Sequence, residues 1–300
     1  MKLSTDINCF YGKFSIFDTI DIIADAGFEE IDFSFMDKSY YDGTVSAEEC
    51  VSHYKEVRKH AASRGLTIGQ SHAPCLTFTD DEEENEIIFK SIARSIANAS
   101  VLGAKTIVVH GYNHIDYSAR GGAERLFELN MNLYNRLRPY CEKYGVKIGV
   151  ENMFRHQKFS DVNAYFGYRK GTRGICTSPD EFVRYMDTLG TDNFVACLDI
   201  GHATVGGERP EEIIYALGKD RLGALHIHDN NGLCDMHTVP YIGGAADWDK
   251  IMKALADIGY DGSFSFEAGN FFNQFPKELF PECAAMVAKI GKHLIAKANQ

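Results

Sequence analysis

The feature that most constrains the fold of this chain is a regular alternation of short strand-like runs with longer helical runs. Eight runs have the length and the apolar character of strands. We place them at residues 3–7, 30–35, 66–71, 106–110, 146–151, 194–199, 222–228 and 263–267. Helical spacing follows at 14–26, 47–63, 82–102, 123–144, from 178 onward, 210–217, 248–258 and 277–297. Several of these helices stop at a glycine, a residue that commonly ends helices.

Eight strand–helix units without a shift in composition predict an α/β protein in which residues 1–300 form a single (β/α)8 TIM barrel. A doubly wound parallel sheet is the alternative. The rhythm breaks once, between residues 152 and 177, where a long polar insertion follows the fifth strand. We predict that this insertion is an active-site loop, because the loops that follow the strands carry the active site in such barrels.

Side chains that bind metals or move protons stand at the ends of six consecutive strands, from the third to the eighth. They are His72, His110, Glu151, Asp199, His226 and Glu267. One histidine at a strand end is often structural, but six coincident strand ends indicate a common site at the mouth of the barrel. Three carboxylates in one mouth would repel one another unless a cation lay between them. The pattern therefore predicts a divalent metal site.

The densest group of such residues lies in segment 225–237, Leu-His-Ile-His-Asp-Asn-Asn-Gly-Leu-Cys-Asp-Met-His. His226 and His228 are two residues apart at the end of a strand, so their side chains should face the same way. Asp235 and His237 follow after a short turn and are close enough in sequence to reach the same place. Imidazole suits zinc, manganese or iron, and carboxylate adds charge and hard oxygen.

The composition disfavours some classes of partner. The chain has 31 Lys and Arg against 42 Asp and Glu, a net charge of −11, which argues against a general nucleic-acid or anionic-membrane surface. Its eight cysteines show no Cys-x-x-Cys spacing, no apolar run is long enough to span a bilayer, and the first residues lack the apolar core of a signal peptide. We therefore expect a cytoplasmic protein with reduced thiols and no membrane association.

The strand-end residues, with the runs Asp199-Ile-Gly-His202, Asp235-Met-His237 and Gly243-Gly-Ala-Ala-Asp-Trp248, resemble the xylose isomerase-like barrel superfamily. This superfamily includes sugar-phosphate isomerases and epimerases and the endonuclease IV enzymes. In its ketose 3-epimerases two Glu, one Asp and one His hold an Mn²⁺ or a similar ion, and the resemblance implies this role for Glu151, Asp199, His226 and Glu267. Endonuclease IV uses three zinc ions, which implies additional ligands at His72, His110, His202, Asp235 and His237.

The resemblance implies a metal-dependent isomerase or epimerase that acts on a sugar, a sugar acid or a sugar phosphate. The ion, Zn²⁺ or Mn²⁺ with Mg²⁺ or Co²⁺ as further candidates, would stabilise an enediolate. Glu151 and Glu267 would be the catalytic pair that transfers a proton at the carbon next to the carbonyl. Two alternatives stay open, a multi-zinc phosphoesterase of the endonuclease IV type and a non-catalytic sugar-binding protein.

We expect the substrate to be a small carbohydrate held by polar side chains near the metal. The predicted substrate-binding residues are Asn152, Arg155, Arg169, Arg173, His202 and His228. Residues 155–173 carry five basic residues against one acid, a local charge of +4 (5 − 1), which suits an anionic substrate. The same segment could be a lid or the contact of a homo-oligomer. The acidic residues 79–86 after the third strand disfavour a nucleic-acid partner.

Overall fold

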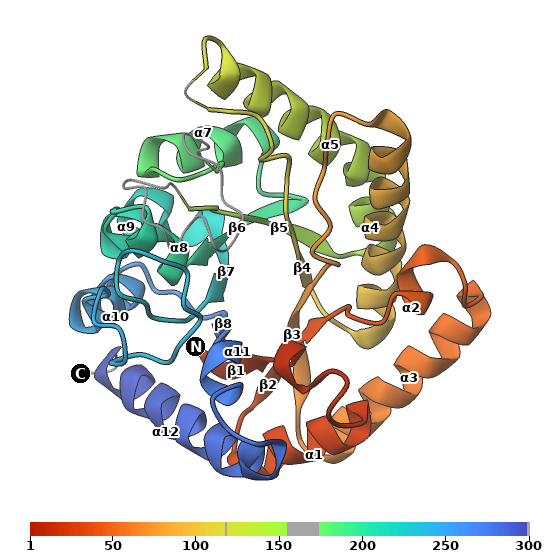
Figure 1. Cartoon of the computed structure of the whole chain (residues 1–300), viewed down its shortest axis with the longest axis vertical. Helices are drawn as coiled ribbons and strands as arrows, with labels where there is room; N and C mark the ends of the chain where they lie inside the picture. The colour runs from red at the N-terminus through yellow and green to blue at the C-terminus, as the bar shows by residue number, and fades with distance from the viewer. Residues whose placement is uncertain (118, 155–173, 299–300) are drawn as a thin grey trace.

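The structure, a computed structural model, describes residues 1–117, 119–154 and 174–298. Eight parallel strands form a barrel that is surrounded by helices (Figure 1). The strands are β1 Lys2–Asp6, β2 Glu30–Ser34, β3 Thr67–His72, β4 Thr106–Val109, β5 Lys147–Glu151, β6 Phe194–Asp199, β7 Leu222–His226 and β8 Ser263–Phe266. The predicted (β/α)8 TIM barrel is confirmed.

The barrel closes between its seventh and eighth strands. Elsewhere, neighbouring strands pair in sequence order, and β1 also pairs with β8. At the closure, the backbone N–H of Ile227 donates to the carbonyl of Ser265 at 2.7 Å, and that of Glu267 donates to the carbonyl of Ile227 at 3.0 Å. These bonds bring the ends of β7 and β8 side by side, so that His226 and Glu267 become neighbours.

Helices cover the outside of the barrel (Figure 1). The long helices are α1 Ile16–Ala26, α3 Ala47–Ser63, α4 Glu82–Leu102, α5 Gly122–Tyr144, α7 Pro179–Leu189, α9 Pro210–Arg221, α10 Trp248–Asp257 and α12 Phe280–Ala298. Shorter elements are η1 Asn8–Phe10, α2 Ser39–Asp42, α8 Ile200–Val205, α11 Gly269–Phe272 and η2 Lys277–Leu279. Among the described helices, none combines the length and the apolar character that a membrane span requires.

Local signals set the ends of the longest helices. Ser46 begins α3 with a capping box, in which its hydroxyl accepts from the backbone N–H of Glu49 and the Glu49 carboxylate accepts from that of Ser46. Asp81 caps α4 by accepting from the backbone of Glu83. Gly27 ends α1 with φ of 87°, a conformation that strains any residue with a side chain.

The inside of the barrel contains a polar layer below the mouth. Asp32 on β2 is fully buried and accepts from Nε2 of Gln70 at 2.6 Å and from Oγ of Ser265 at 3.1 Å. Two residues earlier on the same strand, Glu30 accepts from Nζ of Lys2 at 3.0 Å. The hydrogen bonds of Asp32 to Gln70 and Ser265 hold this layer in a fixed arrangement. It supports the residues of the mouth from below.

Candidate functional site

The six predicted strand-end residues come together at one mouth of the barrel. Four of them are the last residues of their strands, namely His72, Glu151, Asp199 and His226. The other two directly follow a strand, His110 after β4 and Glu267 after β8. A cavity of about 370 Å³ opens at this mouth. Its lining includes His110, Glu151, His202, Asp235, His237 and Glu267. Several residues predicted from the strand ends and from segment 225–237 thus line one cavity.

His226 is central to the first cluster, which consists of Glu151, Asp199, His226 and Glu267. Its Nδ1 lies 3.0 Å from Oε1 of Glu151 and 3.1 Å from Oε2 of Glu267. The same nitrogen lies 3.9 Å from Oδ2 of Asp199. One ligand atom of each of the four residues lies within 4.8 Å of the others. Three carboxylates and one imidazole that converge from four strands can hold a divalent cation.

Asp32 fixes the orientation of the His226 ring. Oδ2 of Asp32 lies 3.5 Å from Nε2 of His226, on the side of the ring that faces away from the cluster. A carboxylate behind a ligating imidazole holds the proton on the far nitrogen and leaves the lone pair of the near nitrogen for the metal. Asp32 is therefore a positioning residue for the first cluster.

Glu151 also faces a second group of histidines with its other oxygen. Oε2 of Glu151 lies 2.8 Å from Nε2 of His110 and 3.5 Å from Nε2 of His72. Nδ1 of His72 donates to the carbonyl of Ala73 at 2.6 Å, so the tautomer that this bond selects has its free lone pair on Nε2. Glu151 is thus shared between two groups of metal-competent side chains.

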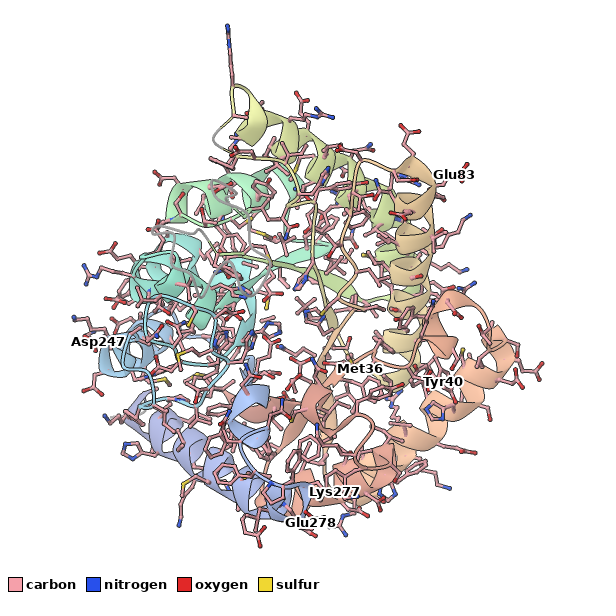
Figure 2. The ribbon with its side chains drawn as sticks, viewed as in Figure 1. Met36, Tyr40, Glu83, Asp247, Lys277 and Glu278 are labelled. Carbon is pink, nitrogen blue, oxygen red and sulfur yellow. The ribbon has the colours of Figure 1, made fainter. Side chains whose placement is uncertain are left out.

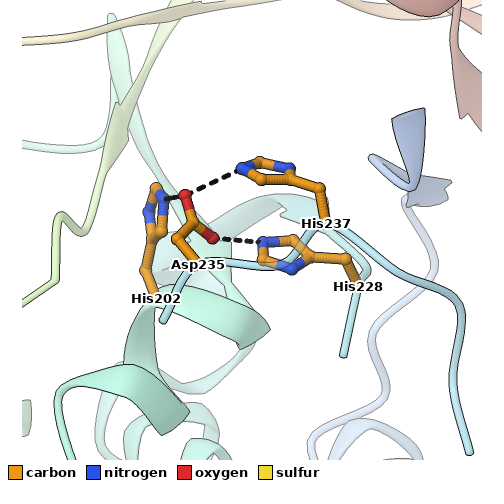
Figure 3. A group of neighbouring side chains, drawn as sticks. All are labelled: His202, His228, Asp235 and His237. Atoms are coloured by element: carbon orange, nitrogen blue, oxygen red, sulfur yellow. Dashed lines mark hydrogen bonds and ion pairs between the residues drawn. The ribbon is translucent and has the colours of Figure 1, made fainter. Parts of the chain in front are cut away.

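Figure 3 shows a third group, in which Asp235 lies between His202, His228 and His237. Oδ2 of Asp235 lies 2.9 Å from Nε2 of His237 and 3.5 Å from Nε2 of His202. Its other oxygen, Oδ1, lies 3.7 Å from Nε2 of His228. A ligand atom of each of the four residues lies within 4.8 Å of the others, which is close enough to surround one ion.

The loop that carries Asp235 and His237 is anchored by a buried carboxylate. Asp229 accepts from Nε1 of Trp248 at 3.1 Å and from the backbone N–H of Tyr241 at 3.2 Å. His237 and Tyr241 have positive φ angles of 43° and 76°, which residues other than glycine adopt only where the surroundings hold them. The anchored loop places His237 over the mouth of the barrel.

When no cation is bound, histidine protons compensate the charge of the carboxylates. Burial opposes ionisation of Glu151, but the nearby charges of His226 and His110 hold its pKa well below the usual range. Burial likewise opposes protonation of His202, but Asp199 and Asp235 raise its pKa to about 10. A divalent cation would supply this positive charge in place of the protons, which its binding would release.

Comparison with known proteins identifies the family of the chain. Residues 20–284 match the sequence profile of the xylose isomerase-like TIM barrel family. The chain belongs to this family. Two solved structures illustrate the shared fold. The first, a D-tagatose 3-epimerase-like protein, has a TM-score of 0.74 and 20% identity over 100% of both chains. The IolI protein with a bound zinc atom has a TM-score of 0.72 and 19% identity over 99% of both chains.

A curated relative of the chain is the D-psicose 3-epimerase of Enterocloster bolteae. It is 24% identical over 220 residues, which cover 71% of this chain and 65% of that protein. A second curated relative, from Methanocaldococcus jannaschii, is 29% identical over 209 residues, which cover 66% of this chain and 64% of that protein. The chain therefore spans slightly less than two thirds of the length of these two relatives.

The donor set of the mouth fits a metal ion of the kind that the family implies. Oδ1 of Asp235 and Oε2 of Glu267 are buried and make no hydrogen bond of good geometry with a described residue, and the only cationic partners near them are the imidazoles of His228 at 3.7 Å and His226 at 3.1 Å among the described residues. Buried oxygens without a donor are costly in a folded protein unless something binds them. Each of these two oxygens belongs to a carboxylate whose cluster also contains histidine nitrogens. A cation would satisfy both oxygens.

The predicted substrate-binding residues differ in where they lie. His202 lines the cavity. Asn152 and His228 are fully buried and instead contact Asp199: Nδ2 of Asn152 donates to the Asp199 carbonyl at 3.0 Å, and Nε2 of His228 lies 3.0 Å from Asp199 Oδ1. Their contact with substrate stays a prediction. The remaining predicted residues, Arg155, Arg169 and Arg173, lie outside the described residues.

Sequence reasoning missed three residues at the mouth or directly below it, which are Asp6, Asp32 and Cys75. Asp6 ends β1 and lines the cavity, so the strand-end criterion applied to the first strand would have found it. Burial, together with the charges of Glu267 and Asp32, raises the pKa of Asp6 to about 7. Cys75 lies in the loop after β3 and also lines the cavity, but no sequence pattern identifies it.

Proposed function

We propose that this protein is a metal-dependent isomerase or epimerase that acts on a small carbohydrate. The observation that carries the proposal is the convergence of Glu151 and Glu267 on Nδ1 of His226, at 3.0 and 3.1 Å, beside the cavity. A pair of carboxylates around a cation site suits proton transfer at a carbon next to a carbonyl. Similarity to a D-psicose 3-epimerase supports a sugar as the substrate.

Glu151, Asp199, His226 and Glu267 are the proposed ligands of the catalytic ion. Three carboxylates and one imidazole accommodate Mn²⁺, Zn²⁺, Co²⁺ or Mg²⁺. When bound, the ion supplies Lewis-acid stabilisation of the negative charge that develops on the substrate oxygens in an enediolate. Asp32 would keep the His226 lone pair directed at the ion, because it holds the proton on the opposite nitrogen.

Glu151 and Glu267 are the proposed proton-transfer pair. They extend from β5 and from the end of β8, so they approach His226 from different directions. Burial opposes their ionisation, but histidines hold the pKa of both carboxyls well below the usual range, which keeps them in the basic form. One would remove a proton from the substrate carbon, and the other would return a proton to the opposite face or to the neighbouring carbon.

Polar side chains of the cavity are suited to sugar hydroxyls. Besides the clusters, the lining contains one further carboxylate and several amides, namely Asp6, Asn8, Asn270 and Asn273. Amides both donate and accept hydrogen bonds, as hydroxyls do. A volume of about 370 Å³ lies at the small end of the range for ligand pockets, which favours a monosaccharide or its derivative.

Solvent hydrogen exchange provides a direct test. Protein loaded with Mn²⁺ or Zn²⁺ is incubated in D₂O with a panel of ketoses, aldoses, sugar acids and sugar phosphates, and NMR follows deuterium uptake next to the carbonyl. We expect uptake with at least one sugar and its loss in Glu267→Gln. Glu278→Gln, at an exposed peripheral position (Figure 2), is the matched control. A fully metal-loaded protein that exchanges no sugar would favour the non-catalytic alternative.

A multi-zinc phosphoesterase is the second candidate, and a specific observation favours it. The mouth contains further metal-competent groups beside the first cluster, among them one around His72 and His110 and one around Asp235. Hydrolases with several metals use the additional ions to activate water and to stabilise the leaving oxygen. Metal content of protein purified without chelator separates the candidates, because one ion per chain favours the isomerase and three zinc ions favour the hydrolase.

A further inference from the structure

A second cavity, which we call the aromatic pocket, lies beside the cavity of the mouth. It has a volume of about 240 Å³ and is lined by the loops that follow β1 and β2 and by residues of α1, α2 and α3. Many of the lining residues carry a ring, namely Tyr11, Phe14, Phe33, Phe35, Tyr40, His53 and Tyr54. No member of the metal-competent groups of the described residues lines it. The aromatic pocket is therefore distinct from the metal-binding part of the mouth.

The rings of the aromatic pocket hold one another in place. The ring centroid of Tyr54 lies 5.5 Å from that of Phe35, with the ring planes 85° apart, and 5.6 Å from that of Tyr40. The Phe33 and Phe35 centroids lie 5.3 Å apart. Such tilted and edge-to-face contacts are the arrangements that aromatic rings prefer. The pocket thus has a preformed wall that can contact a further ring in the same way.

The charge of the lining favours an uncharged ligand. The described residues that line the pocket include one carboxylate, the exposed Asp37, and no Lys or Arg. Burial lowers the pKa of His53, so its imidazole is uncharged at pH 7. An anion would therefore find no positive charge here, whereas an apolar group would be removed from water without loss of a hydrogen bond.

A direct contact joins the walls of the two cavities. Ser34 lines the aromatic pocket, and its Oγ donates to Oδ2 of Asp6 at 3.4 Å. Asp6 lines the cavity of the mouth, and the loop after β1 contributes residues to both linings. Figure 2 shows Met36, another lining residue of the pocket, nearer to the centre of the barrel than Tyr40. The two cavities are therefore neighbours that one ligand can occupy together.

We propose that the aromatic pocket binds an aromatic ring that the substrate carries as a substituent of its sugar. An apolar cavity of about 150 Å³ is large enough for benzene, so about 240 Å³ accommodates one six-membered ring with a small substituent. The substrate class is then an aryl-substituted sugar, with the sugar in the mouth and the ring in the pocket. The inference rests on the proposed function, because that function places the sugar in the mouth.

Matched glycosides test the substrate class. Glycosides have no free carbonyl, so they report binding without turnover. Calorimetry gives the Kd of the zinc-loaded protein for the phenyl and methyl glycosides of a panel of sugars. Burial of a ring corresponds to about 10- to 100-fold in affinity, and we expect at least one phenyl glycoside to exceed its methyl counterpart by this factor. The 4-carboxyphenyl analogue should bind more weakly than the phenyl glycoside. A panel without any phenyl preference would refute the substrate class.

Phenol alone tests the pocket without any sugar. NMR saturation transfer should detect phenol on the wild type and on Ile87→Trp, a control at an exposed position of α4. Met36→Trp should lose phenol binding, because the larger side chain occupies the pocket. Tyr40→Leu removes one ring of the wall and should bind phenol more weakly with an unchanged Kd for methyl glycosides, so the test does not depend on the folding of Met36→Trp. Equal binding of phenol by the wild type and both pocket variants would overturn the proposal.

Two other outcomes have their own signatures. If the chain forms a dimer that phenol dissociates, a second copy and not the substrate fills the pocket, and the proposal is wrong. Failure of the proposed function instead leaves every sugar without deuterium exchange, while phenol still binds to the wild type and is lost in Met36→Trp. The aromatic site and the reaction are thus judged by separate measurements.

Discussion

Replacement of Asp32 by Asn tests whether the first cluster binds a metal through Nδ1 of His226. Asp32 is fully buried and lies 3.5 Å from Nε2 of His226, so its carboxylate favours the tautomer with a proton on Nε2. Asn has almost the same shape but no charge, and its amide can present a donor to the same nitrogen. The variant therefore weakens the selection of the tautomer that a metal requires, without removing a ligand.

The expected loss follows from the position of Asp32 directly behind a ligand. Loss of such a carboxylate partner lowers metal affinity about 10- to 100-fold. This corresponds to about 1.4–2.8 kcal/mol of binding free energy, at about 1.4 kcal/mol for each factor of ten. The effect should be smaller than that of removing a ligand, because His226 still reaches the ion.

Competition with a chromophoric chelator measures the Kd of the wild type and of Asp32→Asn for Mn²⁺ and Zn²⁺. Glu30→Gln is the matched control, since Glu30 is a buried carboxylate on the same strand that bonds Lys2 and Ser263 and no residue of the cluster. We expect Glu30→Gln to lower the free energy of unfolding and to leave the metal Kd unchanged. An Asp32→Asn protein that binds metal as tightly as the wild type would refute the assigned role of Asp32.

Three further outcomes follow from the same geometry. Glu267→Ala should lower metal content and abolish turnover, and a variant with full metal and full activity would refute its assignment as a ligand. Burial opposes protonation of His202, but Asp199 and Asp235 raise its pKa to about 10 in the folded protein, compared with about 6.5 in an unfolded chain. The protonated ring therefore stabilises chelator-treated protein fully below pH 6.5, and this stabilisation is lost as the pH rises to 10. Denaturation midpoints between pH 7 and 10 should therefore fall, and constant midpoints would contradict this. Asp229→Ala should cost about 1–3 kcal/mol for each buried donor left unpaired, notably Nε1 of Trp248, and a loss below 1 kcal/mol in urea unfolding would contradict the anchoring role.

The barrel and its helix ends were predictable because they depend on local residues. The bounds of α3 and α4 coincide with the predicted 47–63 and 82–102, where Ser46 and Asp81 cap the helices. The predicted helix 277–297 instead divides into η2 and α12. The short helices α8 and α11 were not predicted, because helices of this length have little intrinsic stability and form only through tertiary contacts.

The candidate metal residues were predictable because parallel strands of a barrel end at one mouth. Asp32 was not predictable, since its role depends on β2 lying opposite β7 at the level of His226, and no residue near it in sequence carries that information. Cys75 was missed for a similar reason, because the path of the loop after β3 directs its thiol. A cytoplasmic location and a homo-oligomeric state stay predictions.

Part of the acidic run 79–86 forms the start of a helix, one of the two interpretations that its sequence allows. Asp81 caps α4, and Glu82, Glu83 and Glu84 form its first turn, where carboxylates interact favourably with the helix dipole. Figure 2 shows Glu83 at the periphery of the molecule. This run therefore carries little information about whether the mouth can accept a nucleic acid, and the charge of the cavity itself must decide.

A duplex that carries an abasic site should not be cut at physiological salt, even when zinc is supplied. The described residues that line the cavity include four carboxylates, Asp6, Glu151, Asp235 and Glu267, and no Lys or Arg. Each phosphate contact needs a compensating cation, and affinity based on such contacts falls steeply with salt. Bound metals would largely neutralise the carboxylates and leave little positive charge for a duplex. A gel assay with a labelled abasic duplex measures incision at about 50 and 200 mM salt. Efficient zinc-dependent incision would refute this electrostatic argument and favour the phosphoesterase over the isomerase.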